Sequence, residues 1–287
     1  MEVRVFQDAG SFLERAGPFL LADEAGHNLL LGVAATLIAM PRAGAAPPYL
    51  VTVERRGAVL GAAIQTPPSN LILSRLNDPV ATVAAIVADR QQRLPDLPLP
   101  GVIGPRRESR VFAETWGAAT GKTAQLARSE RIYQLAWVTG PERPAAGALR
   151  QAKDDDLPLL RAWIHAFIEE AFGEVRPDAV DRMLQSRLST PTGAFSPWET
   201  AGRPVSLVGW SGPAPNGVRI APVYTPPSHR RRGYAATAIA ALCRDLLAGD
   251  RRWCFLFADL ANPSANLIYQ RIGFHPAGDV DEYAFAH

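Results

Sequence analysis

The chain is poor in cysteine, and it has no long hydrophobic run. Its 287 residues include 2 cysteines, Cys243 and Cys254, and both fall in stretches that we expect to be buried. We therefore expect free thiols in a reducing compartment rather than a disulfide or a catalytic thiol. The longest apolar run, residues 29–40, is shorter than the ~20 residues that a membrane-spanning helix needs, and it predicts a buried core helix. Since the first residues also lack the basic-then-apolar order of a signal peptide, we expect a cytoplasmic protein with no membrane attachment.

Charge of one sign and familiar catalytic motifs are also sparse. The formal net charge is only +2, which by itself gives no indication of nucleic-acid binding. The sequence contains no Gly-x-Ser-x-Gly motif, which argues against a serine hydrolase, and His275 shows no spacing that indicates a metal site. With 47% hydrophobic and 20% charged residues, the composition is that of an ordinary folded protein, and the length suits two domains.

The most informative stretch runs from Val223 to Ala236. An extended segment ends in two prolines, three arginines and Gly233 follow, and an apolar pattern with helical spacing begins at Ala236. A strand that leads through a turn into a helix presents unpaired backbone N–H groups, which together with the helix dipole attract an anion. Gly233 allows the backbone to turn, and the small Ala235 allows a phosphate to come close. The stretch therefore predicts a phosphate-binding turn.

Two patterns in this part of the chain resemble a known family. Arg230-x-x-Gly233-x-Ala235 is similar to [RQ]-x-x-G-x-[GA], the phosphate-binding signature of the GNAT acyltransferase superfamily. Residues 262–274 are similar to the later helix of that family, N-x-x-A-x-x-[LI]-Y-x-x-x-G-F, and the apolar run 253–258 predicts a strand between the two patterns. Because the two patterns occur in the expected order with a strand between them, the last ~140 residues, a size that suits one domain, resemble a GNAT domain.

The resemblance implies a mechanism and a set of site residues. Acetyl-CoA or another acyl-CoA would lie where two parallel strands diverge, and an amine would attack the thioester directly, with no metal. Tyr269 would give a proton to the departing thiolate. The residues implied in acyl-CoA binding are Val223, Tyr224 and Thr225 for the pantetheine, Arg230, Arg231, Arg232, Gly233, Tyr234 and Ala235 for the pyrophosphate, and Asn262 and Asn266 near the second helix.

Simpler explanations exist for several of these residues. Tyr269 could be a packing residue of its helix. Asn262 precedes Pro263 and could be only a helix N-cap, although a cap can also face a ligand. Asn266 could contact either the acyl-CoA or solvent. The arginine run could bind nucleic acid, but no aromatic platform or known nucleic-acid module accompanies it, so we expect no nucleic-acid partner.

The general base is less clear from the sequence. A substrate ammonium must lose a proton before it attacks, and a carboxylate or a chain of waters can accept that proton. Glu199 precedes the central hairpin of the expected domain and is our candidate base. Glu169, Glu170 and Glu174 lie on or just after a helix predicted over 157–172. All four could also be solvated surface charges.

The chain predicts two domains of similar element order. A stretch rich in proline and glycine at 140–147 separates an N-terminal domain, 1–139, from a C-terminal domain, 146–287. Both are expected to be α/β (α+β), each with a mixed central β-sheet flanked by helices. The last strand of the C-terminal domain is expected near 282–286.

Three features of the first half match that order: a hairpin over 48–64, a strand at 70–76 and an amphipathic helix at 79–93. The first half has no arginine–glycine turn, and Ala113 stands where the second half has Tyr269. It therefore resembles a degenerate GNAT domain without an acyl-CoA site; an unrelated α/β domain is the alternative.

These patterns predict a transferase. We expect an acyl-CoA-dependent N-acetyltransferase, with acetyl-CoA as the default donor and a small-molecule or peptide amine as the acceptor. The alternatives are a regulatory module that binds acyl-CoA without catalysis, and an aminoacyl or thiol-precursor acyltransferase of the tandem GNAT type. The protein could be a monomer or a homodimer.

Overall fold

The computed structural model describes the whole chain except residues 41–45, 174, 176–177, 189–191 and 287. The chain forms two compact units. Unit N comprises Met1–Ile132, Phe257–Asn262 and Pro276–His287, and unit C comprises Tyr133–Leu256 and Pro263–His275. Neither unit is therefore one continuous stretch of the sequence. The domains expected at 1–139 and 146–287 rest on the repeated order of elements, and they stay a prediction. None of the helices in the described ranges has the length and apolar character needed to cross a membrane.

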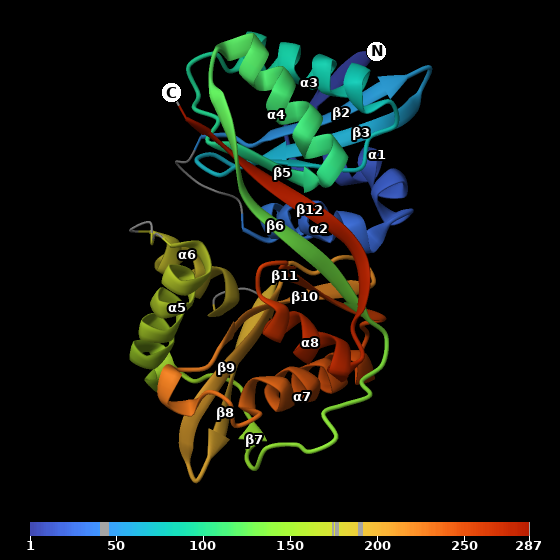
Figure 1. The fold of residues 1–287 in the computed structure, drawn as a ribbon. Helices are drawn as coiled ribbons and strands as arrows, with labels where there is room; N and C mark the ends of the chain where they lie inside the picture. Colours follow the sequence, from blue (N-terminus) through green and yellow to red (C-terminus); the bar gives the residue numbers. More distant parts are fainter. Residues whose placement is uncertain (41–45, 174, 176–177, 189–191, 287) are drawn as a thin grey trace. The chain divides into compact units, whose positions relative to one another are not determined.

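Unit N is built on a mixed sheet. Its strands lie in the order β1 (Glu2–Phe6), β2 (Tyr49–Arg55), β3 (Ala58–Gln65), β4 (Leu71–Leu73), β5 (Gly101–Pro105), β12 (His275–Ala286) and β6 (Thr123–Leu135). β4 and β5 are parallel, whereas β1, β2, β3 and β4 pair with one another antiparallel, and so do β5 and β12. Figure 1 shows α3 (Pro79–Arg93) and α4 (Arg106–Thr120) on one face, and α1 (Ala9–Leu21) and α2 (Glu24–Ala39) on the other.

Local sequence explains several of these elements. The hairpin of β2 and β3 turns at Arg56 and Gly57, both of which have positive φ (51° and 79°), as two-residue hairpin turns require. α3 begins with Pro79 after Asp78, whose side chain accepts a hydrogen bond from the N–H of Ala81. Arg90 and Arg93 lie in the last turn of this helix, where their positive charges interact favourably with the negative end of the helix dipole. The predicted hairpin and the predicted helix 79–93 are both confirmed.

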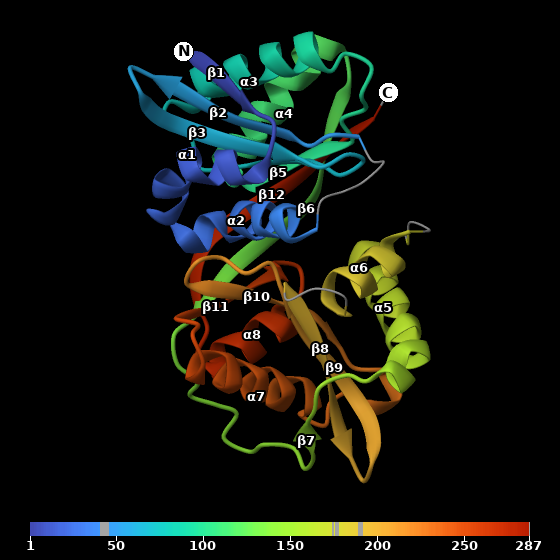
Figure 2. The ribbon, with the colours of Figure 1, turned by 180° about the vertical axis from the view of Figure 1, so that it is seen from behind.

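Unit C also contains a mixed sheet with helices on both faces. Its strand order is β11 (Trp253–Asp259), β10 (Gly217–Tyr224), β9 (Arg203–Ser211), β8 (Gly193–Thr200) and β7 (Ala148–Leu149). α5 (Leu157–Phe172) and α6 (Ala179–Leu188) pack on one face, and α7 (Tyr234–Ala248) packs on the other with α8 (Pro263–Ile272) beside it (Figures 1 and 2). The expected fold class is therefore confirmed, as is the helix predicted over 157–172.

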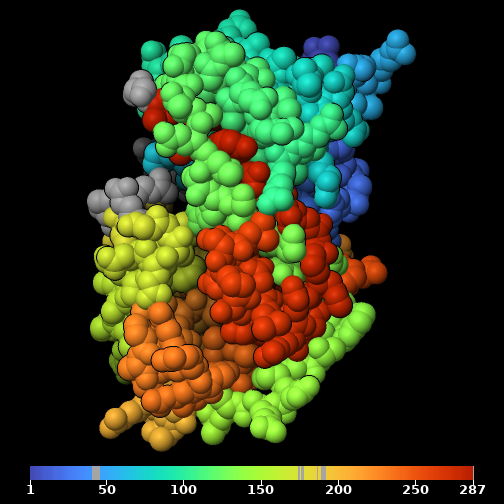
Figure 3. Space-filling view, in the orientation of Figure 1, coloured from blue at the N-terminus to red at the C-terminus, as the bar shows by residue number. Residues whose placement is uncertain are grey.

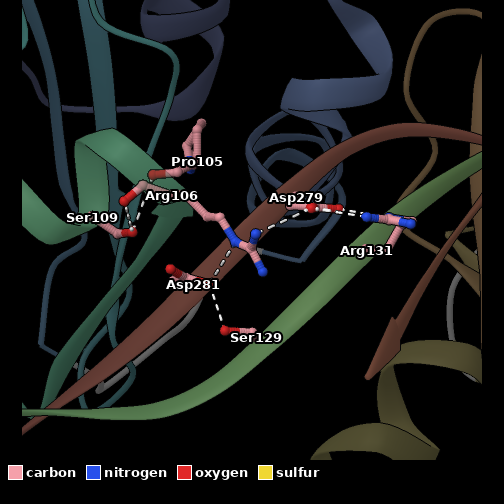
Figure 4. Close-up of polar contacts among 7 residues, drawn as sticks. All are labelled: Pro105, Arg106, Ser109, Ser129, Arg131, Asp279 and Asp281. Atoms are coloured by element: carbon pink, nitrogen blue, oxygen red, sulfur yellow. Dashed lines mark hydrogen bonds and ion pairs between the residues drawn. The ribbon is translucent and has the colours of Figure 1, made fainter. Parts of the chain in front are cut away.

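The last strand is longer than the sequence indicates. We expected it near 282–286, but β12 begins at His275. Its first half contains Pro276, Gly278 and acidic residues, all of which disfavour strands intrinsically. Tertiary ion pairs hold this segment in unit N instead, since Arg131 donates to Asp279 (2.7 and 3.0 Å) and Arg106 pairs with both Asp279 and Asp281 (Figure 4).

Candidate functional site

The central feature of unit C is the early end of the pairing between β10 and β11. The two strands run parallel, and their register extends from Gly217↔Trp253 to Arg219↔Phe255. β10 itself continues to Tyr224, and its register with β9 shifts between Ile220 and Val223. Such a bulge bends a strand. In the described part of the chain, the edge of β10 that faces away from β9 therefore has no strand partner after Arg219.

β10 leads through a turn into the start of α7. Within the turn, Arg231 and Gly233 have positive φ (62° and 79°), and α7 begins at Tyr234 without a side-chain cap. The hydroxyl of Thr237 donates to the carbonyl of Gly233 (3.0 Å) and accepts from the N–H of Ala145 (2.9 Å), which holds the turn in place. The N–H groups of the first turn of α7 are thus available to an anion.

Conformation, rather than lack of space, explains the glycine at position 233. A Cβ atom added there would meet only the Cβ of Ala145, at 3.8 Å, which is ordinary contact. A φ of +79°, however, strains a residue that has a side chain. The turn lies at the surface of unit C, in orange in Figure 3 beside the yellow helices α5 and α6.

The three arginines of the turn are not equivalent. Arg230 donates to both carboxylate oxygens of Glu170 on α5 (2.7 Å each) and to the carbonyl of Thr225 (2.8 Å), and its guanidinium lies over the ring of Tyr224. This arginine therefore connects the end of β10 to α5, and its charge is partly neutralised. Arg231 and Arg232 are exposed, so they are better placed to raise the potential around an anion.

The strand residues predicted to bind pantetheine have inward-facing or bonded side chains. Tyr224 is buried against Trp163 (6.2 Å between ring centroids), Val223 is half-buried, and the Thr225 hydroxyl shares a hydrogen bond of 2.8 Å with that of Ser206. Ser206 also donates to the carbonyl of Tyr224 (3.1 Å). A ligand along this strand would therefore contact mainly its backbone edge.

Tyr269 lies on α8 among other aromatic rings. Its ring centroid is 6.1 Å from that of Tyr133 and 6.1 Å from that of Phe274. Burial, with a smaller effect of Tyr133, raises the pKa of Tyr269 to about 12. Within the described ranges its hydroxyl makes no hydrogen bond, so it is a protonated donor that an incoming group could use.

The two asparagines of the second motif are placed differently. Asn266 is half-buried, and its side-chain oxygen accepts from the hydroxyl of Tyr133 (2.9 Å), to which Gln270 also donates (3.1 Å). Part of its role is therefore structural. Asn262 is exposed directly before α8, and its N–H donates to the carbonyl of Asp259 (3.0 Å). Sequence reasoning missed Tyr133, because nothing local indicates that residues 133 and 266 meet.

Two of the predicted candidate bases are in ion pairs. Glu199 accepts from Arg150 (2.7 Å), which also makes two bonds to Asp156 (2.6 and 2.8 Å). Glu170 is bound to Arg230, as described above. Both carboxylates therefore already have an arginine partner within the protein. Glu169 is exposed, and Glu174 lies outside the described residues.

Comparisons with known proteins agree with this geometry. Residues 200–284 match the family model of FR47-like proteins, a range that contains both motifs. Several solved structures align over nearly the whole chain. One is a GCN5-related N-acetyltransferase from Kribbella flavida, with 14% identity, a TM-score of 0.61 and coverage of 92% of this chain and 96% of that one. This chain has the GNAT fold.

Two further structures have the same fold over the full length. A Drosophila protein is 14% identical with a TM-score of 0.66, and 99% of this chain and 98% of that one are covered. A tandem GNAT protein from the clavulanic acid biosynthesis pathway is 12% identical with a TM-score of 0.58, again covering 99% and 98%. No curated protein matches the sequence significantly. The resemblance inferred from the two motifs is confirmed.

Unit N contains a parallel strand pair like that of unit C, but its surroundings differ. Leu71↔Val102 and Ile72↔Ile103 are in register in β4 and β5. Beyond β4, the N–H of Arg75 donates to Nε2 of buried His27 (3.0 Å), and the N–H of Leu76 donates to Glu108 (3.3 Å).

The helix that follows this strand also differs from α7. α3 starts with the carboxylate of Asp78 as its cap, where α7 starts with no side-chain cap. In unit N, therefore, protein side chains already occupy the backbone donors that stay available in unit C.

Proposed function

We propose that this GNAT-fold protein is an acyl-CoA-dependent N-acyltransferase, with acetyl-CoA as the default donor and a small-molecule or peptide amine as the acceptor. The observation that carries the proposal is the path of β10, which leaves its register with β11 after Arg219 and leads to the uncapped start of α7. Along the chain, this arrangement offers first a free strand edge and then an anion site. Along an acyl-CoA, the amide-containing pantetheine arm and the pyrophosphate come in the same order, so each can meet its matching site.

The donor is held mainly by backbone groups. The pantetheine amides bond to the edge of β10 at Val223–Thr225, and the pyrophosphate accepts from N–H groups between Arg231 and Ala235. The helix dipole of α7 and the exposed arginines favour its negative charge. Asn262 and Asn266 remain predicted contacts of the acyl-CoA. The proposed transfer requires no metal ion.

The chemistry is a direct transfer. The neutral amine nitrogen of the acceptor forms a bond to the thioester carbonyl carbon, the C–S bond breaks, and CoA leaves as a thiolate. The nitrogen of the new amide then loses its extra proton to solvent. The Tyr269 hydroxyl donates a hydrogen bond to the thiolate sulfur. The proton lost by the acceptor ammonium goes to Glu199 or to water, and the ion pair of Glu199 with Arg150 favours water.

Calorimetry with acetyl-CoA tests the donor site. Gly233→Glu introduces strain and a negative charge at the phosphate turn and is expected to abolish binding. Gly202→Glu is a matched control, since Gly202 has a similar φ (+70°) with open space around it, in the β8–β9 turn. Binding should persist in Gly202→Glu. Unchanged affinity in a folded Gly233→Glu protein would overturn the proposal.

A non-catalytic acyl-CoA-binding module is the second candidate. The ion pairs of Glu170 and Glu199 favour it, because two candidate bases are already bound to arginine side chains. Steady-state release of free CoA with a panel of amines distinguishes the two functions: a transferase releases CoA in proportion to acylated amine, and a binding module does not.

A further inference from the structure

Tyr133 stands near the end of β6, and its side chain is fully buried against α8. Its hydroxyl donates to the side-chain oxygen of Asn266 (2.9 Å) and accepts from the side-chain nitrogen of Gln270 (3.1 Å). Positions 266 and 270 have the i, i+4 spacing of neighbours on one face of a helix. A single hydroxyl therefore holds two consecutive turns of α8.

The ring of Tyr133 also contacts Tyr269, which lies on the same face of α8. The two ring centroids are 6.1 Å apart, and the ring planes are tilted by 53°. The ring of Phe274 lies 6.1 Å from that of Tyr269, and the N–H of Phe274 donates to the carbonyl of Tyr269 (3.1 Å). Aromatic neighbours at such distances restrict a ring. Of these two neighbours, Tyr133 is the one that also holds the helix through its hydroxyl.

The rotation of α8 decides where the Tyr269 hydroxyl lies. Tyr269 is half-buried, and in the described part of the chain no hydrogen bond fixes its hydroxyl. A side chain extends roughly 5–6 Å from the axis of its helix, so a rotation of about 10° shifts its tip by about 1 Å. A misplacement of that size can cost about 100-fold in rate. The contacts that hold α8 are therefore important for any reaction that uses this hydroxyl.

We propose that Tyr133 is a positioning residue for the acyl transfer. By holding Asn266 and Gln270, its hydroxyl fixes the rotation of α8 at which the Tyr269 hydroxyl reaches the sulfur of the bound acyl-CoA. In this role Tyr133 stays buried, touches no substrate and exchanges no proton. This inference rests on the proposed function, because it assumes that Tyr269 donates to the departing sulfur.

A double-mutant cycle tests the inference through catalysis. Tyr133→Phe keeps the buried ring and removes the hydroxyl, so turnover should fall about 3- to 10-fold, a part of the loss expected when Tyr269 itself loses its hydroxyl. In a Tyr269→Phe background the same change should cause no further loss, because the group that Tyr133 positions is already gone. Equal losses in the two backgrounds would overturn the inference, since Tyr133 would then act independently of Tyr269.

Two further variants separate positioning from a general loss of stability. Tyr49 is a buried tyrosine of unit N whose hydroxyl donates to Asp89 (2.7 Å), so Tyr49→Phe also removes a hydrogen bond of a buried ring, and turnover should persist. Gln270→Met removes one of the two bonds to Tyr133 from an exposed side chain, and it should cause a smaller loss than Tyr133→Phe. An equal loss in Tyr49→Phe would overturn the inference.

Product binding tests the inference without an acceptor. CoA and desulfo-CoA differ at the sulfur, the atom that Tyr269 is proposed to meet. At pH 9 a thiol with an ordinary pKa of about 8.5 is largely a thiolate, which accepts a strong hydrogen bond. The preference for CoA over desulfo-CoA in calorimetry should be about 10-fold larger in the wild-type protein than in Tyr269→Phe. Tyr133→Phe should have an intermediate preference, and Tyr49→Phe that of the wild type.

The outcomes separate this inference from the proposed function. If the wild-type protein binds neither CoA nor desulfo-CoA, the proposed function fails and the inference with it. If it binds both, and Tyr133→Phe and Gln270→Met keep the wild-type preference, the donor site stands and the positioning role of Tyr133 is overturned.

Discussion

At the scale of the residue, Tyr269 illustrates how burial limits the chemistry of a side chain. Its pKa of about 12 lies well above that of an ordinary thiol, about 8.5. Complete proton transfer from this tyrosine to a thiolate would be uphill by roughly 5 kcal/mol. In the proposed reaction, the hydroxyl would therefore stabilise the departing sulfur by donating a hydrogen bond, and solvent would supply the proton afterwards.

The first prediction follows from this role. Tyr269→Phe keeps the ring and its packing but removes the donor, so turnover should fall about 10- to 100-fold, at or below the lower end of general-acid effects. Acetyl-CoA affinity should change little, because the phosphate turn is untouched. Single-turnover kinetics with a competent acceptor measures the effect, and Tyr283→Phe in unit N serves as a control. Full turnover in Tyr269→Phe while chemistry limits the rate would make Tyr269 a packing residue.

Some contacts of the candidate site can be predicted from the sequence, and others cannot. The phosphate turn depends on Gly233 and on neighbouring residues, so a local pattern reveals it. The ion pairs Arg230–Glu170 and Arg150–Glu199 join residues that are far apart in the chain. No local pattern in the sequence reveals such pairs.

At the scale of the element, β12 depends on charges more than on strand propensity. Arg131 and Arg106 hold Asp279, while the hydroxyl of Ser129 and Arg106 hold Asp281 (Figure 4). Farther along the strand, Glu282 accepts from Arg128 (2.6 Å) and Asn70 (2.7 Å). These contacts attach the end of the chain to strands and a helix of unit N.

The stability of β12 should therefore depend on pH. The hydrogen bond from Arg131 lowers the pKa of Asp279 below its ordinary value of 3.8. A carboxylate whose pKa is lower in the folded state stabilises the fold above its unfolded pKa, and this contribution disappears as the pH falls through the folded pKa.

Asp279→Asn should reduce the free energy of unfolding at pH 7 by about 1 kcal/mol, since the pair is partly exposed. The difference from the wild-type protein should shrink as the pH falls below about 4. Urea denaturation at several pH values measures it, with the exposed Asp96→Asn as control. A difference that does not depend on pH would mean that Asp279 acts through packing and not through charge.

Elements with local signals were predicted well, and elements without them were not. α3 and α5 begin at the predicted residues, because proline and aspartate at their first turns mark those ends. The start of β12 has no such signal, since distant arginines stabilise it. β4 is shorter than the predicted strand at 70–76. The N–H of Ser74 still donates to Ala62 on β3, but the N–H groups of Arg75 and Leu76 donate to the side chains of His27 and Glu108.

At the scale of the whole molecule, each unit places a parallel strand pair before a helix, but the starts of the two helices have opposite character. In unit C, α7 starts after Gly233 and has no side-chain cap. In unit N, α3 starts with the carboxylate of Asp78, which repels a phosphate. The prediction that the N-terminal half binds no acyl-CoA is untested, and these contacts support it.

The last prediction is the number of acyl-CoA sites per chain. Calorimetric titration of the full-length protein with acetyl-CoA should give a stoichiometry of one, because the N–H groups of Arg75 and Leu76 already have acceptors in unit N. Gly233→Glu should then remove all binding, and not one half of it. Asp78→Gly should not create a second site, since His27 and Glu108 still occupy the strand edge. A stoichiometry of two, or one site that survives in Gly233→Glu, would show that unit N binds acyl-CoA and that its polar side chains move aside to admit it.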